Sequence, residues 1–409
     1  MESESGNKKS ASTLPRVGAL YVHVPFCRRK CSYCDFYSLA IGRGQGGAYL
    51  EALAGELRRY EQALPRPCRS IFVGGGTPTV LPKRSLRGLL ALVGPYAGPR
   101  TELTVEANPG TIAGPLAEVL VAGGVNRVSL GVQSFVPDEL AVLGRIHSPG
   151  QAVRAFRLLR REGVENISID LIYGTPGQTL ESWRRSLAEA TDLGIDHLSC
   201  YCLTLGRSTP LWRRCRAGGL GVMDEGLQRD CYEAAIDHAA RAGLKQYELS
   251  NFARPHRQCR HNLTYWRNEA YVGVGPGAAG YLGGRRWTNR ADLEAWARAL
   301  GAGLAAPARG ERIAGRALMA ETLMLALRLT AGVDRHAFLR RFGQDVVDAF
   351  PRSLARHEAI GSLVVTGSRV RLAREFYFTS NAVLADIVAE GSEGERRARS
   401  GQPNGLRDT

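Results

Sequence analysis

Three cysteines stand close together near the start of the chain. Cys27, Cys31 and Cys34 form a Cys-x3-Cys-x2-Cys pattern directly after a predicted β-strand. Thiolates are the ligands that iron–sulfur clusters require, and such close spacing lets one loop wrap around a compact cluster. A structural zinc site usually needs two pairs of ligands, and no second pair accompanies this motif. The pattern therefore predicts a 4Fe-4S cluster in which one iron has no protein ligand and can bind a small molecule.

Glycines and a carboxylate follow two other predicted strands. The run Gly74–Pro78 reads Gly-Gly-Gly-Thr-Pro and matches neither a dinucleotide-binding fingerprint nor a P-loop. Glycines there allow a ligand to lie close to the backbone, although taken alone they favour a tight strand-to-helix turn. Glu106 ends another strand, where it could accept hydrogen bonds from a ribose hydroxyl or an amino group. The alternative is a solvated loop carboxylate.

Gln133 ends a later predicted strand, Arg145 follows twelve residues further on, and Asp170 opens the segment DLIYGTPGQ at the next strand. Three polar side chains on separate strand–loop junctions are consistent with one shared polar ligand. The alternative is an ion pair between Arg145 and Asp170 that braces the rim of the fold.

Six predicted strands must position these groups, and helical patterns lie between them. The strands span residues 19–25, 70–75, 102–107, 127–133, 166–173 and 197–205. Alternating strands and helices imply a parallel sheet with right-handed crossovers. The polar motifs fall at the carboxyl ends of strands, where barrels and open α/β sheets place their active sites. We therefore predict an α/β fold, a partial (βα)6 TIM-like barrel with a smaller, mainly helical C-terminal domain, and one site at the barrel mouth.

The sequence divides into five predicted segments. These are a disordered N-terminus (1–17), the barrel (18–215), a connecting segment (216–299), the small C-terminal domain (300–388) and a disordered tail (389–409). The tail is polar and rich in glycine and charge, which is typical of disorder.

Composition excludes several other classes of protein. The chain has 409 residues, 44% of them hydrophobic, and no apolar run long enough to span a membrane. Its net charge is +15, but only five of the 54 basic residues are lysine and no basic stripe with interleaved aromatics stands out. We therefore predict no nucleic-acid partner. Nine cysteines, an odd number, and no signal-like start favour a reducing compartment, and we expect a cytoplasmic protein.

The cysteine motif, with Tyr33 just before its third cysteine, resembles the hallmark of radical SAM proteins. More narrowly, the resemblance is to the oxygen-independent coproporphyrinogen oxidase-like branch of that family and, within it, to the haem chaperones. It covers residues 18–388 and rests on the segments YVHVPFCRRKCSYCDF, GGGTPT, EANP, GVQSF, DLIYGTPGQ, ELSNFA and HNLTYW.

This resemblance implies S-adenosylmethionine (SAM) as a second cofactor. In the family the free iron chelates SAM, and an electron from the reduced cluster cleaves it to a 5′-deoxyadenosyl radical. The resemblance assigns several residues to cofactor binding. It places Tyr21 and Gly75 with the first SAM, and Gly76 and Thr77 facing a possible second SAM. Tyr33 and Glu106 are further cofactor-binding candidates. Gln133, Arg145 and Asp170 resemble the positions that hold the second SAM in the coproporphyrinogen enzyme.

His261 opens the motif His-Asn-Leu-Thr-Tyr-Trp, which resembles the HNxxYW motif of the haem chaperones. Imidazole is a common axial ligand of haem iron, and Tyr265 and Trp266 can supply the flat apolar walls that a porphyrin needs. His261 is therefore our candidate haem ligand. A hydrogen-bonded structural histidine is the alternative.

Phe36 separates the two functions that the resemblance offers. The coproporphyrinogen oxidases carry a fourth cysteine at this place, two residues after the third, and a longer N-terminal lead-in. Both differences favour a haem chaperone that binds haem, the cluster and SAM and passes haem to an acceptor protein. A respiratory cytochrome is a candidate acceptor, and an electron donor is a further expected partner. The alternative is a radical enzyme that decarboxylates coproporphyrinogen III to protoporphyrinogen IX; SAM cleavage is plausible in either case.

Overall fold

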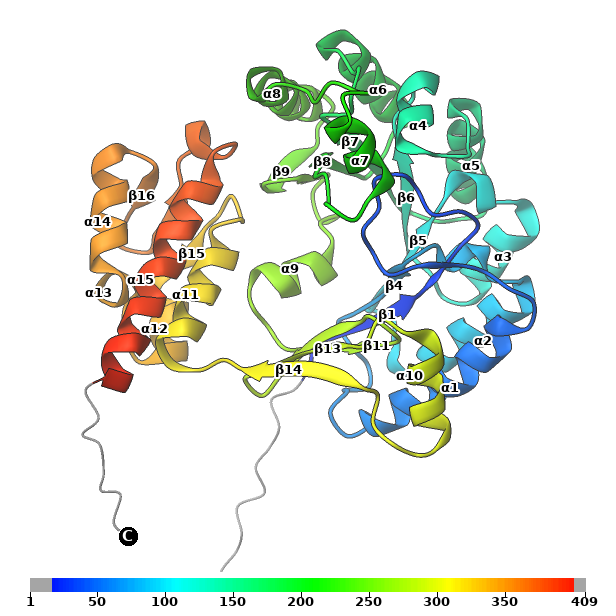
Figure 1. Cartoon of the computed structure of the whole chain (residues 1–409), viewed down its shortest axis with the longest axis horizontal. Helices are drawn as coiled ribbons and strands as arrows, with labels where there is room; N and C mark the ends of the chain where they lie inside the picture. The colour runs from blue at the N-terminus through cyan, green and yellow to red at the C-terminus, as the bar shows by residue number, and fades with distance from the viewer. Residues whose placement is uncertain (1–16, 401–409) are drawn as a thin grey trace, which may run out of the picture.

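The computed structural model describes residues 17–400, with side chains described as far as residue 392 (Figure 1). Its largest feature is a mixed twelve-stranded sheet in the order β14-β13-β12-β11-β1-β4-β5-β6-β7-β8-β10-β9. A three-stranded sheet, β15-β17-β16, belongs to the C-terminal part of the chain. The α/β class and the smaller C-terminal domain predicted from the sequence are both confirmed.

Six neighbouring parallel strands form the centre of the large sheet. They are β1 (Ala19–Val24), β4 (Ser70–Gly75), β5 (Glu102–Ala107), β6 (Arg127–Gln133), β7 (Asn166–Tyr173) and β8 (His197–Cys202). The predicted strands agree with these to within one residue, except that β8 ends three residues early. Most of their side chains are buried, as expected for parallel strands that helices cover.

Helices connect these strands and cover the outside of the sheet. They are α1 (Gln45–Arg59), α2 (Lys83–Val93), α3 (Gly114–Ala122), α4 (Pro137–Leu143), α5 (Pro149–Arg161) and α6 (Leu180–Asp192). Capping boxes at Ser148 and Thr179 start α5 and α6, each satisfying two backbone donors. The apolar faces of the helices, with Leu53 and Trp183 among the fully buried side chains, form the core against the sheet.

The predicted connecting segment, 216–299, is built into the large sheet at both edges. After α7 (Pro210–Arg216) and α8 (Glu225–Arg241), β9 (Lys245–Glu248) and β10 (Asn251–Ala253) extend the edge beyond β8. The chain then crosses through α9 (Arg260–Trp266), and β11 (Tyr271–Val274) pairs in parallel with β1. The same edge continues through β12 (Ala279–Leu282), β13 (Arg285–Asn289), α10 (Leu293–Gly301) and β14 (Ala308–Arg312).

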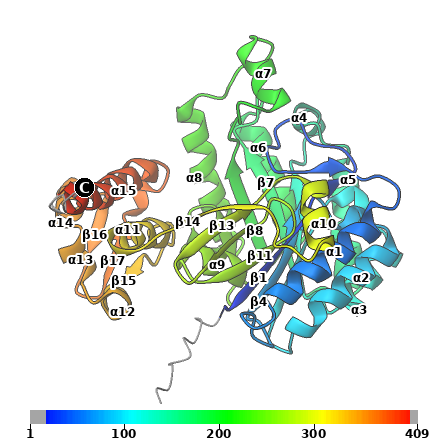
Figure 2. The ribbon, with the colours of Figure 1, turned by 60° about the horizontal axis from the view of Figure 1, so that its bottom comes forward.

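The C-terminal domain lies beside the edge of the barrel that carries α9 (Figure 2). Its helices are α11 (Gly315–Ala326), α12 (Arg335–Phe342), α13 (Val346–Ala349), α14 (Pro351–Ile360) and α15 (Ser380–Ser400), and its strands are β15 (Val333–Asp334), β16 (Leu363–Val365) and β17 (Arg369–Leu372). Within residues 17–400, no helix is both long and apolar enough to cross a membrane.

The prediction of a disordered tail from residue 389 is wrong as far as Ser400, because α15 continues to that residue. Glu390 gives the physical reason. Its buried carboxylate accepts the backbone N–H of Ser353 at 2.8 Å and pairs with Arg316 at 3.3 Å, which ties α15 to α14 and α11. Residues 1–16 and 401–409, also predicted to be disordered, lie outside the described part of the chain.

Candidate cofactor site at the mouth of the barrel

A cavity of about 520 Å³ opens where the six parallel strands end. Every predicted site residue except Tyr21 and His261 lines it, although these residues come from well-separated parts of the sequence. They are Cys27, Cys31, Tyr33, Cys34, Gly75, Gly76, Thr77, Glu106, Gln133, Arg145 and Asp170. The carboxyl ends of the strands therefore bring these side chains to one site, as the strand order requires.

The cysteine loop is fastened to the helices at the barrel rim. It lies between two short strands that pair in parallel, β2 (Phe26–Cys27) and β3 (Leu39–Ala40). The Ser32 backbone N–H donates to the Leu143 carbonyl at the end of α4 at 3.0 Å, and the Ser32 carbonyl accepts from Leu211 of α7 at 2.9 Å. Gly144 ends α4 with a φ of 71°, and a Cβ there would come within 2.9 Å of the Ser32 nitrogen. Close packing against Gly144 thus fixes the middle of the loop.

The three thiols suit a cluster better than a single metal ion. All three are free and partly exposed to the cavity. Among residues 17–400, no three His, Cys, Asp or Glu side chains converge as ligands of one metal ion. In a 4Fe-4S cluster each thiolate binds a different iron, and three free thiols that line one cavity supply that donor set. Arg145 Nη1 donates to Cys31 Sγ at 3.3 Å, and burial raises the pKa of Cys34.

The glycine run is shaped by close packing as well as by the cavity. Gly75 has a φ of 105°, and a Cβ there would lie 2.5 Å from the ring of His23. A Cβ on Gly76 would lie 2.5 Å from the Phe26 carbonyl oxygen. The backbone N–H groups of Gly76 and Thr77 donate to the carbonyls of Val24 and Phe26 at 2.8 and 2.7 Å. The tight-turn interpretation therefore accounts for the glycines, while the same residues line the cavity.

The carboxyl group of Glu106 lines the cavity and has an unusually high pKa. Its Oε2 accepts the Gly75 N–H at 2.9 Å. Burial, followed by the nearby negative charge of Asp170, raises the pKa of Glu106 to about 7, while the Gly75 hydrogen bond acts in the opposite direction. A cationic or hydroxylated ligand in the cavity would stabilise the ionised form.

Arg145 and Asp170 do not form the rim ion pair that was the alternative. Arg145 donates to Cys31 and to the Gly131 carbonyl, and Asp170 accepts from the hydroxyls of Ser129 at 2.9 Å and Ser168 at 3.1 Å. Burial raises the pKa of Asp170, and these hydroxyl hydrogen bonds oppose the shift. Both groups are thus held separately on the cavity wall.

Gln133 adopts a left-handed backbone conformation, with a φ of 72°. It stands where the pairing of β6 with β7 slips by one residue, between Gly131 and Gln133. Left-handed backbone is uncommon for residues other than glycine and clusters at functional sites. The irregularity turns Gln133 onto the cavity wall.

Tyr21 and His261 lie behind the cavity wall. The Tyr21 hydroxyl bonds to His23 Nδ1 at 3.0 Å, and Tyr21 lines a second cavity of about 430 Å³. Both ring nitrogens of His261 have partners, Ser70 Oγ at 3.1 Å and the Tyr265 hydroxyl at 2.8 Å. Burial, then Arg69 and Arg127, lowers the pKa of His261 to about 3, so the ring is neutral. In this structure His261 is therefore a buried, hydrogen-bonded structural residue. Its neighbour Asn262 lines the barrel cavity.

Sequence reasoning missed Arg127, a buried guanidinium on the wall of the barrel cavity. Its Nε has no hydrogen-bond partner among the described residues. The available signal was a charged residue at the start of a strand that is predicted to be buried, since buried charges are rare without a functional or structural partner. Phe36, by contrast, lies at the cavity with 64% of its surface exposed.

Comparisons with known proteins agree with this arrangement. The Radical SAM superfamily model matches residues 21–190, and the HemN C-terminal domain model matches residues 313–375. Heme chaperone HemW from Bacillus subtilis is 34% identical over 375 residues, which cover 90% of this chain and 99% of that protein. Heme chaperone HemW from Mycobacterium tuberculosis is 40% identical over 321 residues, covering 77% and 82%.

Among solved structures, coproporphyrinogen III oxidase (HemN) from Escherichia coli matches with a TM-score of 0.79 and 23% identity. The match covers 91% of this chain and 90% of that protein. At this identity the likeness establishes a shared fold.

Proposed function

The chain belongs to the HemW family of the radical SAM superfamily, and on that premise we propose that it is a haem chaperone, which binds haem, a 4Fe-4S cluster and SAM and transfers haem to an acceptor protein. One observation carries the cofactor part of this proposal. Three free thiols on a short loop share a single cavity with acidic and basic groups of three neighbouring strands, β5 to β7, and their loops.

The donor set of the cavity fits both cofactors. Cys27, Cys31 and Cys34 would hold the cluster, which with SAM bound supplies one-electron chemistry. Glu106 and Asp170 would accept hydrogen bonds from amino or hydroxyl groups of SAM, and Arg145 would face its carboxylate. Because the pKa of Glu106 is about 7, a cationic ligand that binds beside it near neutral pH would stabilise the carboxylate, and Glu106 would release its proton.

Phe36 favours the chaperone over the dehydrogenase that is the alternative. Its side chain is exposed at the cavity and offers no ligand atom, at the position where the oxidases resembled by this sequence carry a fourth cysteine. The fold shared with HemN does not decide between the two functions, because one fold can carry different sites.

We propose a cytoplasmic protein that receives electrons from a separate donor and delivers haem to an acceptor, with a respiratory cytochrome as the candidate. The strongly basic net charge of +15 would favour acidic surfaces on such partners.

An anaerobic experiment separates the two functions. The cluster is reconstituted, and haem or coproporphyrinogen III with SAM and a reductant is added in separate samples. A stable haem spectrum without formation of protoporphyrinogen IX is expected. Conversion of coproporphyrinogen III without haem binding would overturn the chaperone proposal in favour of the enzyme. Cys34→Ser removes a cluster thiol, and Cys215→Ser, outside the cavity, is its matched control.

A further inference from the structure

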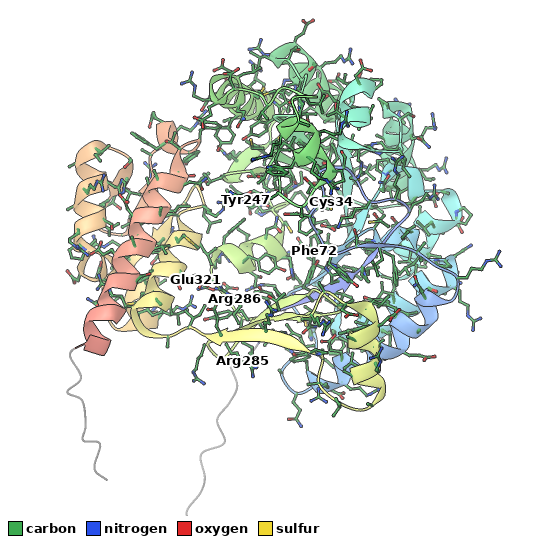
Figure 3. The ribbon with its side chains drawn as sticks, in the orientation of Figure 1. Cys34, Phe72, Tyr247, Arg285, Arg286 and Glu321 are labelled. Atoms are coloured by element: carbon green, nitrogen blue, oxygen red, sulfur yellow. The ribbon has the colours of Figure 1, made fainter. Side chains whose placement is uncertain are left out.

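A second concave region lies between the barrel and the C-terminal domain. It consists of two cavities, of about 430 and 640 Å³, that share Met324 and Leu325 of α11. Together they form what we call the interdomain groove, which lies between α9 and β11–β13 on one side and α11 and α15 on the other. In Figure 3, Arg286 and Glu321 mark this groove, while Cys34 marks the barrel cavity. Each half falls within the volume range of ordinary ligand pockets.

A single layer of aromatic rings separates this groove from the barrel cavity. Phe72 lines the barrel cavity, Tyr21 lines the groove, and their ring centres are 6.2 Å apart. The ring of His261 fills the same layer, 5.2 Å from Phe72. The groove is therefore distinct from the cofactor site but lies next to it.

The two aromatic residues of the HNxxYW motif face the groove. Tyr265 lines its smaller half and Trp266 lines its larger half. The larger half is otherwise mainly apolar, with Leu384 and Val388 of α15 opposite Trp266, and Val388 is 39% exposed. A flat apolar ligand would cover these surfaces without leaving polar groups buried.

Arg328 places a positive charge in this apolar surrounding. Its guanidinium lies 4.7 Å from the centre of the Trp266 ring. Within residues 17–400 it forms no ion pair, and the buried Arg328 Nε and Trp266 Nε1 have no hydrogen-bond partner. The guanidinium is partly exposed to the groove, and the carboxylate near it, Glu248, forms no ion pair with it. A ligand carboxylate could supply the missing hydrogen-bond acceptor for Nε. The groove therefore suits a planar apolar ligand that carries an acidic group.

Met324 is the one sulfur-bearing side chain that lines the groove, and it belongs to both halves. Thioether sulfur is an established axial ligand of haem iron. His261, in contrast, has both ring nitrogens engaged by Ser70 and Tyr265 and lies within the aromatic layer.

We propose that the interdomain groove is the haem-binding site, with Arg328 pairing with a haem propionate and Met324 presented to the iron. This inference rests on the proposed chaperone function and gives it a location. A haem bound there lies on an open, partly exposed surface rather than inside the barrel, which suits a ligand that must be handed to another protein.

The test is a haem titration of the full-length protein with its cluster reconstituted, followed by absorbance in the oxidised and reduced states. Arg328→Gln should weaken haem binding about tenfold, through loss of one charge-assisted contact. Met324→Leu should change the absorbance bands of the complex. Met319→Leu on the same helix and Arg298→Gln, an exposed arginine on α10, are the matched controls and should behave as the wild type. SAM binding by each variant checks that the barrel site is intact.

The outcomes separate this inference from the function on which it rests. If the wild-type protein binds no haem, the chaperone proposal itself fails. If it binds haem, and Arg328→Gln and Met324→Leu match the controls in affinity and spectrum, only the groove is overturned. Loss of haem binding in His261→Gln, with cluster content and SAM binding retained and the groove variants unaffected, would move the site to His261.

Discussion

Replacing Glu106 by glutamine should change how the stability of the protein depends on pH. The carboxyl group is partly buried beside the barrel cavity, and desolvation raises its pKa from an ordinary value of 4.5 to about 7. Glutamine has nearly the same shape, and its carbonyl oxygen can still accept the Gly75 N–H. The substitution therefore removes the titration of this group while leaving its main hydrogen bond in place.

The size of the change in stability follows from the shift in the pKa of Glu106. In the folded protein Glu106 keeps its proton until pH about 7, whereas in the unfolded chain it loses the proton near pH 4.5. Between these values unfolding releases a proton, so the contribution of Glu106 to stability falls as pH rises. A shift of about 2.5 units at 1.36 kcal/mol per unit gives an upper limit of about 3 kcal/mol, reduced by the partial exposure of the carboxyl to the cavity.

The assay is urea unfolding of the wild-type protein and Glu106→Gln at several pH values between 4 and 8, without SAM. The difference in free energy of unfolding should move in favour of the variant by up to about 3 kcal/mol across this range. Other buried carboxyl groups, such as Glu56, affect both proteins and largely cancel in the difference. Glu51→Gln, on the exposed face of α1, is the matched control and should show no such change.

A difference that stays constant between pH 4 and 8 would refute the reasoning, because it would mean that Glu106 titrates alike in the folded and unfolded states. SAM provides a second check. If its cationic groups lie near Glu106, as we propose, the wild-type protein should lose less stability with rising pH when SAM is bound.

Three further predictions concern the cysteine loop and the end of the chain. Cys34→Ser should lower the iron content and visible absorbance of the reconstituted protein, and a variant that retains both at the level of Cys215→Ser would contradict the cluster assignment. Gly144→Ala should cost about 1–3 kcal/mol in urea unfolding because of its positive φ and close contact, whereas Gly94→Ala, in an open helical position, should cost far less. Glu390→Ala should speed hydrogen exchange in α15 beyond residue 388, and unchanged exchange there would show that this carboxylate does not hold the helix.

Local pattern was sufficient to predict the barrel and most of its site. Alternating strands and helices produce a parallel sheet, and residues at the carboxyl ends of parallel strands must meet. For this reason Cys27, Glu106 and Asp170 were expected together before any contact was known, and the structure places them around one cavity. The spacing of the three cysteines needed no tertiary information, because one loop carries them all.

The position of α9 and the formation of the interdomain groove depend on strand pairing between distant parts of the chain. Nothing local in residues 216–299 shows that β11 will add in parallel to β1, and this pairing puts α9 beside β4 and buries His261 against Ser70. Tyr21 was expected in the barrel site, yet it lines the groove on the other side of the Phe72 ring. A sequence records which residues neighbour one another along an element, but which side of a layer a buried side chain faces depends on the partners that later parts of the chain bring to it. That is why the cofactor site could be predicted from its motifs, while the interdomain groove, formed by α9, α11 and α15, became visible only in the folded chain.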